Sequence, residues 1–87
     1  EEFIMLLPNT STAKALIIAE QIRSAVESHL WQITSTVSKP LAITISISVA
    51  NSNDSSFNEQ YDLMALINKA ESLLYQAKDL GRNRVCS

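Results

Sequence analysis

The chain has 87 residues, a formal net charge of −2 and a hydrophobic share of 46%, which together fit at most one small globular domain. The slight acidity argues against a generic binder of nucleic acid or of membrane surfaces, because such proteins are usually basic. No apolar run approaches the roughly 20 residues of a membrane helix, and the acidic start is unlike a signal peptide. The single cysteine, Cys86, excludes an intrachain disulfide.

The chain opens with a short apolar run over residues 3–7, which Pro8 ends. A run of this length next to turn residues predicts a buried strand. A frayed apolar terminus is the alternative. Glu1 is interpreted as a cut end, because the chain lacks an initiator methionine and begins on two acidic residues.

A helix is predicted over residues 11–29, with Thr10, Ser11 or Thr12 as its cap. Charged residues border its apolar stripe, and the three-residue spacing of Glu20 and Arg23 allows a surface ion pair. The stripe itself follows helical spacing through Ala15, Ile18, Ala19, Ile22 and Val26.

Residues 30–38 and 41–50 predict a hairpin, with the break at Pro40, which cannot donate to a strand ladder. The second run alternates strictly and is the clearest strand signal in the chain. One of its faces carries only small or hydroxyl side chains, so we expect close packing there by a helix from outside these 87 residues or by a ligand. That face comprises Thr44, Ser46, Ser48 and Ala50.

Residues 51–61 predict a loop, and a second helix is expected from a cap at Asp62 to a stop at Gly81. Residues 84–86 predict a final edge strand. The order strand, helix, hairpin, helix, strand predicts an α+β fold with an antiparallel or mixed sheet flanked by helices. A core of this size is marginal alone.

Lys78 and Arg82 stand on either side of Gly81, the only glycine in the chain. One interpretation is that both cations merely suit the negative end of a helix. The other is that they point outward and hold a polyanion, with phosphate as the best match.

Residues 77–83, Ala-Lys-Asp-Leu-Gly-Arg-Asn, resemble the closing signature of the GGDEF domain, the diguanylate cyclase domain of bacterial signalling. Residues 1–8 look like the end of a Gly-Gly-Glu-Glu-Phe motif running into a strand, and residues 43–50 are similar to the family's central strand. The resemblance covers nearly the whole chain, but only the C-terminal half of such a domain, with the N-terminal half absent. It implies part of a nucleotidyl-cyclase-like fold in the order β-α-β-β-α-β.

The resemblance also implies an activity. Diguanylate cyclases condense two GTP molecules into cyclic di-GMP with release of pyrophosphate, and they use Mg²⁺ or Mn²⁺. Two domains meet as a homodimer for catalysis, and a sensor domain commonly precedes each one. Such domains are cytoplasmic, with any attachment to the inner membrane made by other segments.

Carried over by position, Glu1 matches a metal-binding acid and Glu2 an acid needed for catalysis. Lys78 and Arg82 match the cations that hold the triphosphate, while Asn83 is interpreted as structural. The motif glycines, a second metal-binding aspartate and the guanine-binding residues would lie upstream of Glu1. The 87 residues alone are therefore expected to be inactive.

Two residues depart from the family pattern: Ser48 stands where glycine is common, and Gln21 where some members have an arginine that binds inhibitory product. Two alternatives to a cyclase stay open. One is a catalytically inactive module of the same fold that binds GTP, cyclic di-GMP or a protein partner. The other is a small regulatory domain in which Lys78 and Arg82 only cap a helix.

Overall fold

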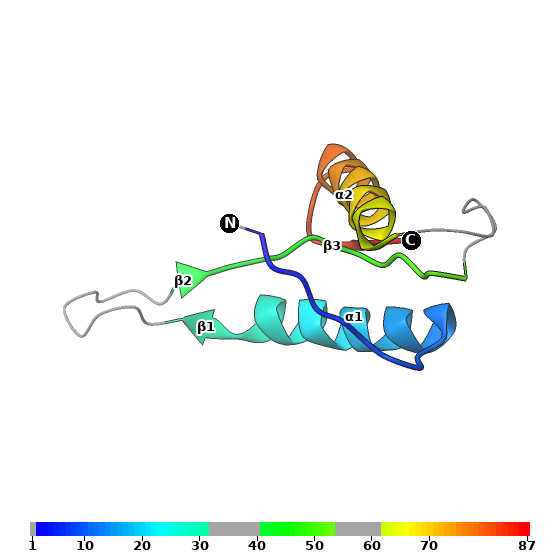
Figure 1. Ribbon diagram of the computed structural model, residues 1–87. Coiled ribbons are helices and arrows are strands. Elements are labelled where there is room, and N and C mark those ends of the chain that lie inside the picture. The colour runs from blue at the N-terminus through cyan, green and yellow to red at the C-terminus, as the bar shows by residue number, and fades with distance from the viewer. Residues whose placement is uncertain (1, 32–40, 54–61) are drawn as a thin grey trace.

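A computed structural model describes residues 2–31, 41–53 and 62–87 of the chain. Two helices dominate it, and each has 17 residues. Four short strands accompany them (Figure 1). In chain order the elements are α1 (Thr12–Ser28), β1 (Leu30–Trp31), β2 (Leu41–Ala42), β3 (Ile47–Ser48), α2 (Leu63–Asp79) and β4 (Val85–Cys86).

Both helices begin with the same kind of cap. The hydroxyl of Ser11 accepts a hydrogen bond from the Lys14 amide at 3.2 Å, and the carboxylate of Asp62 accepts one from the Ala65 amide at 2.8 Å. Each bond satisfies one of the free N–H groups of a first helical turn. The two predicted helices are thereby confirmed, including the caps at Ser11 and Asp62.

The strands form two separate pairs. β3 runs parallel to β4, with Ile47 opposite Val85, and hydrogen bonds of 3.0 and 2.8 Å join the amides of Ile47 and Val49 to the carbonyls of Arg84 and Cys86. β1 and β2 pair in antiparallel fashion. This pairing agrees with the predicted hairpin, while residues 32–40 lie outside the described residues, as do residues 54–61 of the predicted loop.

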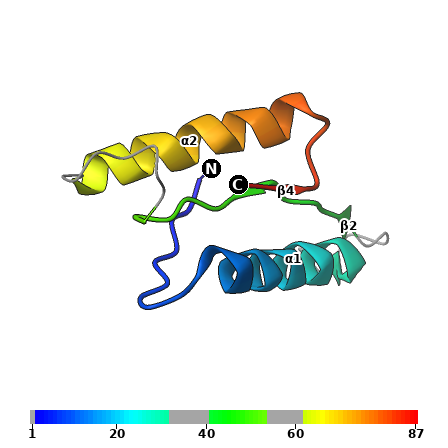
Figure 2. The same cartoon turned by 90° about the vertical axis from the view of Figure 1, so that its right-hand side faces the viewer.

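The β3–β4 pair is the middle layer of the molecule. α2 packs on both strands, and α1 contacts β4 from the other side (Figure 2). The core between these layers is small, because among the described residues the buried apolar side chains are mostly alanines. They are Ala15 and Ala19 of α1, and Leu73 and Ala77 of α2.

The continuous strand predicted over residues 41–50 is wrong in part. The chain forms β2 and then β3, and residues 43–46 between them belong to neither. The partners explain the interruption, because β2 pairs with β1 whereas β3 pairs with β4. The predicted sheet is therefore present as two small sheets, while the final strand is confirmed as β4.

The buried strand predicted over residues 3–7 is also wrong for the described structure. Phe3 is 90% exposed and Leu6 is 67% exposed, and the segment joins neither sheet (Figure 1). A strand needs hydrogen-bonding partners along its edge, and no described strand supplies them here. No helix in the described part of the chain is long and apolar enough to cross a membrane.

Candidate functional site

The candidate site is built on the C-terminal end of α2. The amide of Gly81 donates to the carbonyl of Lys78 at 3.3 Å, and the amide of Arg82 donates to the carbonyl of Ala77 at 3.0 Å. These two bonds define a Schellman motif, which needs a left-handed residue just after the helix. Gly81 has φ 118°, so the predicted glycine stop is confirmed.

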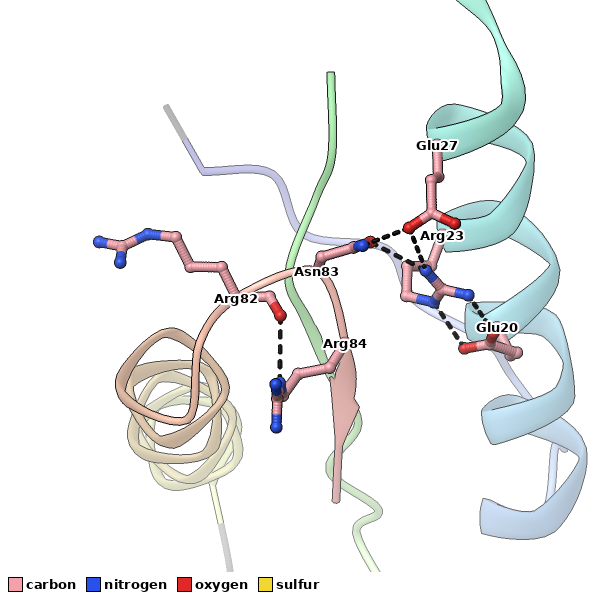
Figure 3. Close-up of polar contacts among 6 residues, drawn as sticks. All are labelled: Glu20, Arg23, Glu27, Arg82, Asn83 and Arg84. Atoms are coloured by element: carbon pink, nitrogen blue, oxygen red, sulfur yellow. Dashed lines mark hydrogen bonds and ion pairs between the residues drawn. The ribbon is translucent and has the colours of Figure 1, made fainter. Parts of the chain in front are cut away.

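The left-handed backbone continues beyond the glycine. Arg82 has φ 63° and Asn83 has φ 48°. Asparagine tolerates this conformation, whereas for other L-residues it costs roughly 1–2 kcal/mol. The tight turn sends the two side chains in opposite directions, with Asn83 directed at α1 and Arg82 away from it (Figure 3).

The two cations predicted to hold phosphate lie close together. Lys78 is in the last turn of α2 and Arg82 follows the glycine, and both line one shallow hollow together with Tyr75 and Asp79. The hollow has a volume of about 190 Å³. The Lys78 side chain is 42% exposed and Arg82 is exposed, so an anion in solvent can reach both.

Glu2 lies beside this pair although 76 positions separate it from Lys78 along the chain. Its carboxylate oxygen is 3.4 Å from the Nζ atom of Lys78. An exposed ion pair of this kind contributes about 0–1 kcal/mol, so it indicates placement rather than stability. The structure thus brings Glu2 to Lys78, and Lys78 and Arg82 to one hollow at the C-terminal end of α2, whereas Glu1 lies outside the described residues.

The donor chemistry at this end suits a hard cation. Mg²⁺ prefers carboxylate oxygens and is commonly held by one or two carboxylates together with substrate phosphates. Glu2 supplies one such carboxylate next to the cations. Within residues 2–31, 41–53 and 62–87, no three His, Cys, Asp or Glu side chains gather as a metal cluster. Glu2 alone, paired with Lys78, does not form a complete metal site in the described part of the chain.

A polar network on the opposite side of the turn was not predicted. The guanidinium of Arg23 donates to Glu20 at 2.8 Å through Nε, to Glu27 at 3.1 Å and to the Asn83 side-chain oxygen at 2.8 Å through Nη1 (Figure 3). Asn83 in turn donates to Glu27. The hydrogen bonds to Arg23 lower the pKa of Glu20 below its ordinary value, and those to Glu20 raise the pKa of Arg23.

The predicted pair of Glu20 and Arg23 is confirmed. The contact with Asn83 was missed because 60 positions separate it from Arg23. The only sequence signal was that the charged residues of α1 border its apolar stripe, which places them at the rim of the packed face.

Ser48, the departure from the family pattern, is accommodated by a hydrogen bond. Its hydroxyl donates to the carbonyl of Ala70 in the middle of α2 at 2.6 Å. Ser48 on the small polar face of β3 therefore packs against α2. The sequence had predicted a helix outside these 87 residues or a ligand there, and the described structure places a helix of this chain instead. Serine at this position ties the strand to the helix and does not separate them.

Comparison with known proteins decides the family. Residues 1–84 match the family described as "Diguanylate cyclase, GGDEF domain". The chain belongs to the GGDEF family. It aligns with an uncharacterized protein, YhcK, of Bacillus subtilis at 43% identity over 86 residues, which is 99% of this chain and 22% of that protein.

Relatives named as cyclases and regulators align over the same GGDEF segment. Diguanylate cyclase A of Treponema denticola is 40% identical over 88 residues, which covers 98% of this chain and 21% of that protein. The response regulator PleD of Caulobacter vibrioides is 38% identical over 85 residues, which covers 98% of this chain and 18% of that protein. The chain thus spans about a fifth of the length of these curated relatives.

Proposed function

We propose that residues 1–87 are the C-terminal half of a diguanylate cyclase domain, which condenses two GTP molecules into cyclic di-GMP. The observation that supports this best is that Lys78 and Arg82 line one hollow, with Glu2 paired to Lys78, in a GGDEF-family chain. Two cations beside a carboxylate suit a triphosphate and its metal ion. The N-terminal half would supply the guanine-binding residues and the second metal-binding aspartate.

In the proposed reaction the 3′-hydroxyl of each GTP attacks the α-phosphate of the other. A new phosphate–oxygen bond forms each time and one pyrophosphate leaves, so two domains acting as a homodimer make one product and two pyrophosphates. Lys78 and Arg82 hold the triphosphate through charge-assisted hydrogen bonds. Glu1 would hold Mg²⁺ or Mn²⁺, which would neutralise phosphate charge, and Glu2 would be the acid required for catalysis.

The wider setting is part of the proposal. A sensor domain upstream would control when two cyclase domains meet, and the reaction would take place in the cytoplasm, where GTP is available. The 87 residues alone are proposed to be inactive, because they carry only part of the active site. Measurable cyclic di-GMP from residues 1–87 alone would contradict this.

The test uses the domain extended upstream by about the length of this chain. It is incubated with GTP and Mg²⁺, and cyclic di-GMP is measured by chromatography and mass spectrometry. Lys78→Ala should lower the rate about 100-fold, as expected for losing one group that stabilises transition-state charge. The matched control is Lys14→Ala, which removes an exposed cation from α1 and should leave the rate unchanged.

Three outcomes are distinct. Product that depends on Lys78 supports the cyclase and the phosphate role together. Lys78-dependent binding of GTP without product would replace the cyclase with an inactive binding module of the same family. A rate that Lys78→Ala leaves unchanged would mean that this cation only caps α2.

A further inference from the structure

Arg23 uses its whole guanidinium to join three partners. Nε and Nη2 donate to the Glu20 carboxylate, and Nη1 is shared between Glu27 and Asn83. Asn83 closes the ring by donating to Glu27. The Arg23 side chain is only 16% exposed, so these bonds are partly shielded from water, and a planar fork is the group that suits several fixed acceptors at once.

The bond to Asn83 adds α1 to the elements that hold this turn, which α2 holds at Gly81 and Arg82 and β3 holds at Arg84. The Schellman bonds tie Gly81 and Arg82 back to α2, and the Arg23 network ties Asn83 to α1 (Figure 3). Two consecutive non-glycine residues with positive φ persist only where the surroundings hold them. The turn is therefore fixed between the two helices.

Neighbouring residues of this turn have separate tasks. Asn83 points at α1 and is held there, while the adjacent Arg82 points the other way, toward the hollow that it shares with Lys78 (Figure 3). Because the two residues are consecutive in a constrained backbone, holding the Asn83 side chain also holds the Cα atom from which the Arg82 side chain extends. A hydrogen bond from α1 thus ends one residue away from a cation on the far side of the turn.

We infer that Arg23 is a positioning residue for phosphate binding, acting through Asn83 on Arg82. The inference rests on the proposed function, since it takes the bound anion to be the triphosphate of GTP. Arg23 itself does not touch the substrate. It reduces the conformational entropy that the Arg82 side chain loses when GTP binds, and such preorganisation raises affinity.

The experiment measures GTP affinity by calorimetry in the complete domain. Arg82→Ala should weaken GTP binding about tenfold, the change expected for losing one charge-assisted hydrogen bond to the phosphate. Arg23→Ala should weaken GTP binding several-fold but by no more than Arg82→Ala, because it acts only through Arg82. The double variant should be no weaker than Arg82→Ala alone, because Arg23 has nothing left to position. Lys14→Ala, the matched control on α1, should bind GTP as the wild type does.

A second set of measurements separates positioning from general loss of structure. Asn83→Gly keeps a residue that accepts positive φ but removes the side-chain amide, so it should weaken GTP binding as Arg23→Ala does. Arg23→Lys keeps the charge but lacks the fork, and it should recover only part of the affinity. Guanosine, which has no phosphate, should bind all these variants equally.

Each result decides between the two proposals. A wild-type domain that binds no GTP would overturn the proposed function and this inference together. Wild-type binding that Arg23→Ala leaves unchanged would overturn only the inference. So would additive losses in the double variant, or an equal loss of guanosine and GTP binding, since both would show that Arg23 acts on the fold and not through Arg82.

Discussion

Residues 3–7 are apolar but exposed, whereas residues 81–84 are polar but held in place by their neighbours. The first segment is apolar throughout, yet Phe3 is 90% exposed and no described strand pairs with it. The second is polar, yet side-chain and backbone bonds from both helices hold it. A segment of this chain is held in place where bonding or packing partners are present. Apolar side chains alone do not hold a segment until a complementary surface covers them.

The largest predicted effect on stability is at Ala77, the buried residue of α2 whose carbonyl helps to hold the turn over residues 81–84. Ala77 is completely buried and its carbonyl accepts the Arg82 amide. Ala77→Glu in the complete domain should lower the free energy of unfolding by about 3–5 kcal/mol, because it buries an unpaired charge. Denaturant unfolding measures the loss. Gln76→Glu adds the same charge to an exposed neighbour on the same helix, and an equal loss there would contradict the burial argument.

The next prediction tests whether residues 3–7 are exposed in the 87 residues alone but covered in the complete domain. In residues 1–87 alone, Leu6→Ser should leave the helix content in circular dichroism unchanged, because Leu6 is 67% exposed. We propose here that in the complete domain the upstream half covers this segment. The same substitution should then cost about 2–4 kcal/mol of unfolding free energy, as large-to-small changes in a core do. No cost in the complete domain would mean that residues 3–7 stay exposed there.

A smaller effect is expected at the glycine stop. Gly81→Ala in the complete domain should lower stability by about 1–2 kcal/mol, because an L-residue is strained at φ 118°. The added Cβ would also lie 3.0 Å from the Nη2 atom of Arg84, which must move. Thermal unfolding measures the change. Asn9→Gly, at another left-handed position, is the control and should stay within about 0.5 kcal/mol of the wild type.

The smallest effect is a dependence on pH. The pKa of Glu20 is lowered from its ordinary value of 4.5 by its hydrogen bonds to Arg23. A depressed pKa means that this contact stabilises the fold fully above the ordinary value and is lost as the pH falls through the lower folded value. The melting temperatures of the wild type and Glu20→Gln should therefore differ slightly at pH 7 and converge in acid. A gap that widens in acid would contradict this sign.

Much of the local structure could be predicted from the sequence. Helical spacing and the cap residues located both helices, and Gly81 marked the end of α2, because these signals act within a few residues of each other. The strands were harder. The alternation of residues 41–50 is continuous, but pairing with two different partners interrupts the strand, and no local signal reports that change.

The candidate site also combines contacts that local sequence predicts with contacts that it does not predict. Lys78 and Arg82 are four positions apart around a glycine, so their proximity follows from local geometry. Glu2 joins them from the other end of the chain, and only the family resemblance indicated that it would. The contact between Arg23 and Asn83 was missed, because tertiary packing creates it. Asn83 was interpreted as structural from its place in the signature, but no local signal named Arg23 as its partner.

The hydrogen bond from Ser48 to Ala70 has a consequence for the distant end of α2. Moving the helix along its axis by one turn would shift the two atoms apart by about 5.4 Å, so the bond selects one longitudinal register of α2 over β3. Ala70 and Lys78 lie on the same helix at a separation of roughly 12 Å. Ser48 of β3 thus fixes the position of α2 along its own axis, and with it the position of Lys78 in the last turn.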